Sequence, residues 1–141
     1  MIYTAYESGI LFNRAHAAVY ARISAVLSRY NLTASDWSIL VFTEKAPEGI
    51  RLASVARSMN VKAPLVTMLV NDLIKQGYVK RIPHHTDGRA KLLIMTSHGS
   101  KVLNQISQQM DDQIKELTQG VSAEDMKIFT RCLEVILKNA G

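Results

Sequence analysis

An amphipathic segment, followed by a glycine and two strand-like runs, constrains this chain most. Between residues 62 and 76 apolar side chains recur at three- and four-residue steps, the spacing of one buried helix face, and they are Val66, Leu69, Val70, Leu73 and Ile74. Pro64 suits the first turn of such a helix, where its missing N–H is not needed. Gly77 supplies the left-handed residue that commonly ends a helix. The segment therefore predicts a helix from Lys62 to Gln76 with one buried and one exposed face.

A shorter helix is predicted before this segment and a β-hairpin after it. Within residues 52–59 the apolar side chains share one helical side, and they are Leu52, Val55, Ala56 and Met59. Residues 78–82 and 90–95 are rich in β-branched and aliphatic side chains, as strands are, and the loop from Pro83 to Arg89 is rich in turn residues. Ile50 and Arg51 are expected to add a short strand. This order of elements predicts a winged helix-turn-helix over residues 31–96, in a mainly α chain.

Helices are also predicted on both sides of the winged region. Residues 3–30 read as one helix that Asn31 and Leu32 end, and Thr33 reads as the N-cap of the next. Residues 97–118 and 123–137 read as two more helices, with Thr96 and Ser122 as their N-caps and a break at Gly120. The last of these helices has an apolar face that we expect to be buried, formed by Met126, Phe129, Leu133, Ile136 and Leu137. The apolar surface of the helices at both chain ends exceeds the area that a small domain can bury by itself. Regions 1–30 and 97–141 are therefore expected to form the dimerisation region of a homodimer.

The positive charge of the chain is concentrated in the winged region. The sequence carries 17 basic and 12 acidic residues, a net charge of +5 at pH 7. Residues 51–101 hold nine of these bases and two acids, Asp72 and Asp87, a net charge of +7, while the remainder has a net charge of −2. Neutralisation of DNA phosphates requires such an excess. We therefore predict double-stranded DNA as the partner.

Neither a membrane protein nor a secreted one is indicated. No apolar run approaches the roughly 20 residues that a bilayer span needs, and residues 1–7 lack a basic region followed by an apolar block, so no signal peptide is expected. The single cysteine, Cys132, excludes an internal disulfide framework and fits the reducing cytoplasm. It lies on the apolar face of the last predicted helix, where a buried thiol is usually inert.

Catalysis and cofactor binding are not indicated either. The sequence has no nucleophile elbow, no phosphate-binding glycine loop and no zinc-protease motif, so we predict that the protein is not an enzyme. His84, His85 and Asp87 are candidate metal ligands, but adjacent loop histidines point in different directions and no fourth ligand is suitably spaced. We interpret them as polar loop residues and predict no metal and no cofactor.

Several short motifs, in this order and spacing, resemble the MarR family of transcription regulators. Residues 32–40 (LTASDWSIL) are similar to the family's LTxxQ(W/F)xxL, residues 52–56 (LASVA) to its LxxLA, and residues 69–77 (LVNDLIKQG) to its LVDxLxxxG. Arg81, residues 87–89 (DGR) and residues 96–99 (TSHG) match its pattern R…D(x)R…LTxxG, with Met95 in place of leucine. The resemblance covers nearly the whole chain.

The resemblance implies a dimer joined by its first and last helices, with the helix from Lys62 to Gln76 in the major groove and the hairpin wing in the minor groove. Arg89 would enter the minor groove, whose negative potential favours arginine, and Asp87 would shape the wing turn and hold Arg89. Many members carry arginine in place of Met68 and aspartate in place of Asn71, so base preference is not transferred. The predicted DNA-binding residues are Lys62, Ala63, Pro64, Thr67, Met68, Asn71, Asp87, Arg89 and Lys91.

An effector site is implied by the same resemblance. Many relatives bind a small anionic aromatic molecule between the dimer helices and the winged domain, and the residues expected to line such a crevice are His16, Tyr20, Arg22 and Trp37. For each of them individually, a role as a core or surface residue is the favoured interpretation.

Two other functions stay open at this point. A winged helix can serve as a protein-interaction module without sequence-specific DNA binding, although the basic concentration disfavours that reading. The chain can also be a ligand-sequestering protein whose DNA activity is vestigial.

Overall fold

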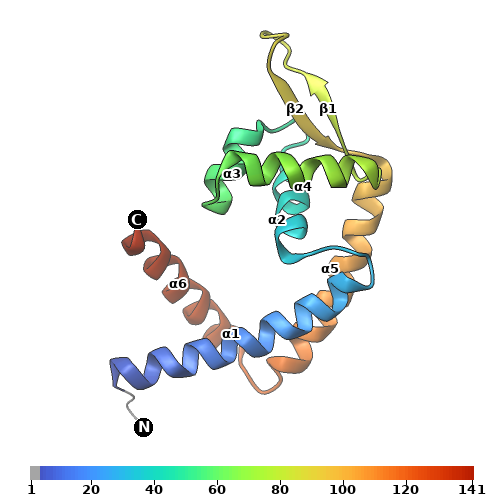
Figure 1. Ribbon diagram of the computed structural model, residues 1–141. Coiled ribbons are helices and arrows are strands. Elements are labelled where there is room, and N and C mark those ends of the chain that lie inside the picture. Colours follow the sequence, from blue (N-terminus) through green and yellow to red (C-terminus); the bar gives the residue numbers. More distant parts are fainter. Residues whose placement is uncertain (1–3) are drawn as a thin grey trace.

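Six helices and one β-hairpin make up the computed structural model, which describes residues 4–141. The elements are α1 (Ala5–Ser28), α2 (Ala34–Glu44), α3 (Leu52–Met59), α4 (Ala63–Lys75), β1 (Val79–Pro83), β2 (Lys91–Met95), α5 (Ser97–Leu117) and α6 (Ala123–Ala140). Helices α2–α4 and the hairpin gather at one end of the molecule, and α1, α5 and α6 extend to the other (Figure 1). The predicted winged helix-turn-helix is confirmed. The predicted helix start at Tyr3 lies outside the described residues, as do the first residues of the segment screened for a signal peptide.

Three helices end in the same hydrogen-bonded turn. The turns are centred on Asn31 (φ 56°), Asn60 (φ 55°) and Gly77 (φ 79°), each in the left-handed conformation. After α4, the Gly77 N–H donates to Ile74 O at 2.9 Å and the Tyr78 N–H donates to Leu73 O at 3.0 Å. This pair of bonds satisfies carbonyls that the helix itself leaves free. The helix stops predicted at Asn31 and Gly77 are confirmed.

The predicted N-caps are also confirmed. Thr33 and Asp36 form a capping box at the start of α2, with the Asp36 N–H donating to Thr33 Oγ1 at 3.2 Å and the Thr33 N–H donating to Asp36 Oδ2 at 2.8 Å. Thr96 and Ser122 accept from the third residue of α5 and α6 in the same way. A capping box that the sequence analysis did not predict joins Thr4 to Glu7, and its hydrogen bonds lower the pKa of the Glu7 carboxyl.

The wing is an antiparallel pair of strands whose register runs from Val79 opposite Met95 to Pro83 opposite Lys91. Three strand boundaries differ from the prediction, since both strands begin one residue later and β1 ends at Pro83 rather than at Ile82. Tyr78 is not in β1 because its N–H closes the turn after α4, and Ala90 is not in β2 because its N–H donates to Asp87 O inside the wing loop. The predicted extra strand is confirmed at one residue, since Ile50 forms an antiparallel bridge to Leu93.

The hydrophobic core lies where the winged elements meet α5 and the C-terminal end of α1. Its buried members come from all five helices before α6 and from both strands, and include Leu27, Leu40, Val55, Val70 and Leu93, each with no exposed surface. Leu69 and Ile74 of α4, predicted to be buried, are only half-buried at the margin of this core. The shared core therefore holds α4 and the hairpin in a fixed position relative to each other.

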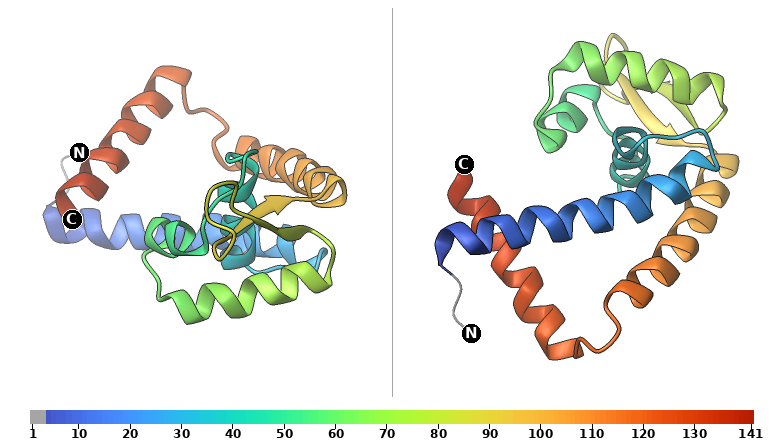
Figure 2. Two further views of the ribbon diagram at one scale, coloured as in Figure 1. Left: turned by 90° about the horizontal axis from the view of Figure 1, so that it is seen from above. Right: turned by 60° about the horizontal axis from the view of Figure 1, so that its bottom comes forward.

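The helices at the chain ends leave much of their apolar surface uncovered. Only Val26 and Leu27 are buried in α1, and α6 has no buried residue. The prediction of a buried face on α6 is therefore wrong for the isolated chain: Phe129 is 50% exposed and Leu137 72%. Helices α1, α5 and α6 form an open triangle, in which α6 returns toward the N-terminal half of α1 without packing closely on it (Figure 2). Among residues 4–141, no helix combines the length and apolar character needed to cross a membrane.

Candidate nucleic-acid interface

Helix α4 presents a continuous exposed stripe. Val66, Val70 and Leu73 are fully buried and hold one side of the helix against the core. The opposite side carries exposed residues three and four positions apart, the spacing that brings side chains onto one face, and these are Pro64, Thr67, Met68, Asn71 and Lys75. Met68 is 56% exposed although it is apolar. Thr67, Met68 and Asn71, three of the predicted DNA-binding residues, therefore lie on one solvent-facing stripe together with Pro64 and Lys75.

The N-terminus of α4 is open to solvent. Lys62 is the N-cap and makes no side-chain capping bond, and Ala63 and Pro64, in the first turn, are exposed. The positive end of the helix dipole makes such a terminus favourable for an anion, and the lysine at the N-cap adds to the effect. This arrangement suits contact with a phosphate group.

The tip of the wing is organised by side chains that hydrogen-bond to its backbone. The Arg89 N–H donates to Asp87 Oδ1 at 3.1 Å, the turn-shaping bond expected of Asp87. His84 Nδ1 accepts from the N–H groups of Thr86 and Asp87, each at 3.2 Å. This structural role of His84 was not predicted from the sequence. Arg89 and Lys91 are both exposed.

The charge of this region faces outward. All nine basic side chains of residues 51–101 are exposed, and so are Asp72 and Asp87. Within the described part of the chain the only ion pair joins Arg22 to Glu116, outside this region. The net charge of +7 is therefore not neutralised by internal pairing and is available to a polyanion.

Helix α4 and the wing are joined by a hydrogen bond that the sequence analysis missed. Arg81 Nη2, on β1, donates to Asn71 Oδ1, on α4, at 3.0 Å. Both side chains are exposed. Arg81 carried part of the family resemblance but was not among the predicted site residues, since no local pattern connects two residues ten positions apart across a helix end.

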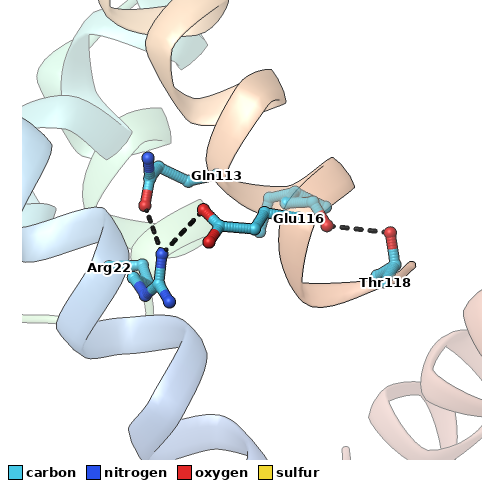
Figure 3. Close-up of polar contacts among 5 residues, drawn as sticks. Arg22, Gln113, Glu116 and Thr118 are labelled. Carbon is cyan, nitrogen blue, oxygen red and sulfur yellow. Dashed lines mark hydrogen bonds and ion pairs between the residues drawn. The ribbon is translucent and has the colours of Figure 1, made fainter.

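The four residues predicted for an effector crevice have different surroundings. The rings of His16 and Tyr20 stack on the surface of α1 with centroids 5.9 Å apart. Arg22 Nη1 donates to Gln113 Oε1 at 2.8 Å and lies 3.0 Å from Glu116 Oε2, so its guanidinium turns toward α5 (Figure 3). Trp37 packs against the core, and its buried Nε1 has no hydrogen-bond partner among the described residues.

An apolar pocket of about 480 Å³ lies between α1 and α6. Its walls include Leu11, Phe12, His16, Phe129 and Leu133. Of the four residues predicted for the effector crevice, His16 alone lines it. The pocket is continuous with the uncovered apolar faces of the two helices rather than with the winged region.

Cys132 differs from its prediction, because the thiol is exposed on α6. The helix face that was expected to bury the thiol is not covered by any other part of the chain that the structure describes. Among residues 4–141, no three His, Cys, Asp or Glu side chains gather as metal ligands would.

Comparison with known proteins agrees with the geometry. Residues 30–90 match the model of the MarR family. The chain is 22% identical to the homoprotocatechuate degradative operon repressor of Escherichia coli, over 86% of this chain and 81% of that protein. It is similar in structure to CouR from Rhodococcus jostii RHA1 bound to p-coumaroyl-CoA (TM-score 0.84, 23% identity, covering 92% of this chain and 91% of that one). It also resembles a mutant MarR from Escherichia coli complexed with operator DNA (TM-score 0.78, 23% identity, 92% of each chain). The winged helix-turn-helix of this chain, over residues 30–90, thus matches the model of the MarR family, and its overall fold is similar to those of the solved structures.

Proposed function

We propose that the protein is a sequence-specific DNA-binding transcription regulator that acts as a repressor. The observation that carries the proposal is the exposed stripe of α4 beside an arginine-tipped wing, within a region whose nine bases all face solvent. Affinity would come from these bases and specificity from the stripe, because phosphate contacts position a protein while base contacts specify the sequence. The name of the Escherichia coli relative, an operon repressor, supports the direction of regulation.

The proposed active species is a homodimer formed through regions 1–30 and 97–141. The uncovered apolar side chains on α1 and α6 support this, and they include Ile10, Leu11, Phe12, Phe129, Ile136 and Leu137. Isolated exposed apolar residues are ordinary, but contiguous ones mark an interaction surface. Two-fold pairing would present two copies of α4 to successive major grooves of a pseudo-palindrome, with half-sites about one helical turn apart.

The test is sedimentation and DNA binding across a range of salt concentrations, using duplexes selected from a random pool. The protein alone should sediment at twice its chain mass of 15.7 kDa. If the dimer neutralises six or more phosphates, affinity should fall roughly a thousandfold or more between 50 and 200 mM salt. A monomer, or binding that ignores salt, would contradict the proposal. Salt-insensitive binding of a protein partner would favour the interaction module instead.

We further propose that a small aromatic or anionic ligand releases the protein from DNA. Trp37 Nε1, which is buried and has no hydrogen-bond partner among residues 4–141, supports a ligand, since an unmade buried hydrogen bond costs about 1–3 kcal/mol that an acceptor would recover. The His16–Tyr20 stack offers an aromatic surface, and a CouR structure contains p-coumaroyl-CoA. Release requires that the ligand bind the DNA-free arrangement more tightly than the DNA-bound one.

Trp37 is the single tryptophan of the chain, so its fluorescence reports on this proposed site. Titration with benzoate- and cinnamate-type carboxylates should give a saturable change in emission and lower DNA affinity over the same concentration range. The amides of the same acids, which lack the charge, are the controls. A linear, non-saturating response, or saturation without any effect on DNA binding, would contradict an effector role at Trp37.

A further inference from the structure

We propose that Arg81 sets the base preference of the recognition helix by fixing the orientation of the Asn71 amide. Held in this way, Asn71 presents hydrogen-bond donors to the major groove and favours guanine over adenine. The inference rests on the proposed DNA-binding function and names the chemistry that one position of α4 would select.

The orientation of the amide follows from the chemistry of its partner. A guanidinium has only N–H donors and no acceptor, so the amide atom 3.0 Å from Arg81 Nη2 must be Oδ1 rather than Nδ2. Arg81 is not drawn away by a carboxylate, since it makes no ion pair within the described residues. Its backbone belongs to β1, which pairs with β2 through Arg81 and Leu93, and Leu93 is fully buried. The bond therefore ties the exposed face of α4 to the rigid base of the wing.

The hydrogen bond from Arg81 determines which atoms of Asn71 remain free to contact a base. Nδ2 keeps both N–H groups for a ligand, whereas Oδ1 already accepts from a cation. An asparagine reads adenine by donating to N7 and accepting from the N6 amino group. With Arg81 beside Oδ1, an incoming amino group would place further positive hydrogens next to the guanidinium, which is unfavourable. Guanine offers two acceptors, N7 and O6, at the same edge and has no such conflict.

The side chains of the stripe that neighbour Asn71 do not discriminate guanine from adenine in this way. Thr67 Oγ1 donates to Ala63 O, one turn back on its own helix, at 3.2 Å. Met68 offers only apolar contact, as to a thymine methyl group. Asn71 is thus the one side chain among these three that offers unengaged N–H donors, and Arg81 controls how they are aimed.

The experiment measures affinity for every single-base variant of a duplex that the wild-type protein selects from a random pool. Asn71→Ala locates the position that Asn71 reads, because the preference there should flatten. At that position the wild-type protein should favour guanine, and Arg81→Ala should shift the ratio of adenine to guanine affinity by about fivefold or more toward adenine. Lys80→Ala is the matched control: it removes one exposed positive charge from the adjacent residue of β1.

Each result of these affinity measurements either supports or overturns the proposed role of Arg81. A uniform loss of affinity in Lys80→Ala, together with an altered base ratio in Arg81→Ala, would support the inference. Identical base profiles for Arg81→Ala, Lys80→Ala and wild type would overturn it while leaving the proposed function intact, and so would a wild-type preference for adenine. Absence of binding to any duplex would instead overturn the proposed function, and the inference with it. Unchanged thermal unfolding of the variants excludes a folding defect.

Discussion

Replacing Gly99 with alanine is expected to lower the free energy of unfolding by about 3 kcal/mol or more, the upper end of the cost of overpacking. Gly99 is buried in the first turn of α5, where it faces the backbone of Tyr78. A Cβ added there would collide with the Tyr78 carbonyl oxygen and lie 2.8 Å from the carbonyl carbon. Both contacts are with backbone atoms, so no side-chain rotation relieves them.

The Tyr78 backbone has little freedom to move away. Its N–H closes the turn after α4 by donating to Leu73 O, and its carbonyl oxygen accepts from the Thr96 N–H at 3.1 Å. Thr96 Oγ1 donates to Gly77 O at 2.6 Å and accepts from the Gly99 N–H at 2.9 Å. Gly99→Ala thus strains the junction at which α4, the wing and α5 meet.

Chemical denaturation followed by circular dichroism measures the effect of Gly99→Ala. Gly9→Ala is the matched control, because Gly9 is also helical but a Cβ there meets no atom of the described residues within 4 Å. This control should leave stability unchanged or raise it by roughly 0.5–1 kcal/mol, the helix propensity gained. Equal stabilities for the two variants would show that the approach of α5 to Tyr78 is looser than described.

Local signals explain why most helix boundaries are predictable. Thr33, Thr96 and Ser122 cap helices through bonds to residues three positions later. The turn at Gly77 closes α4 through a bond from Gly77 to Ile74, three positions earlier, and a bond from Tyr78 to Leu73, five positions earlier. Such interactions are complete within one short segment, so the residue types at those spacings already specify them. The periodic apolar pattern of α4 likewise predicts both its buried side and its exposed stripe.

The features that could not be predicted from the sequence are of two kinds. Some depend on contacts between residues distant in sequence, and others depend on whether an apolar helix face is covered by the same chain. No local sequence pattern predicts these contacts, because only the fold brings the paired residues together. The pairs are Arg81 with Asn71, Tyr78 with Gly99, and Arg22 with Glu116. The apolar periodicity of α6 predicts a face that prefers burial, yet it does not say whether the same chain provides the cover. For this reason the prediction that the Cys132 thiol is buried was wrong.

Replacing Arg89 with alanine is expected to weaken operator binding about a hundredfold at moderate salt without changing the oligomeric state. Loss of one charge-assisted contact costs about 1.5 kcal/mol, a proposed dimer loses two, and each 1.4 kcal/mol is a factor of ten. Arg89 is exposed at the wing tip, and its backbone is held by Asp87 at 3.1 Å. Its exposed side chain and anchored backbone suit the proposed insertion into the minor groove. Fluorescence anisotropy with the selected duplex gives the affinity, and sedimentation checks the assembly.

Arg89→Lys distinguishes insertion into the groove from simple charge. Lysine keeps the positive charge, so distant attraction to phosphates survives, but its compact and strongly hydrated ammonium gives up water less readily in a narrow minor groove. We expect an affinity between those of wild type and Arg89→Ala, with the slope of affinity against salt close to wild type, whereas Arg89→Ala should reduce that slope by about one per arginine removed. Wild-type affinity in Arg89→Ala would remove the wing from the mechanism. Full recovery in Arg89→Lys would make Arg89 a phosphate contact, and specificity would then rest on the stripe of α4 alone.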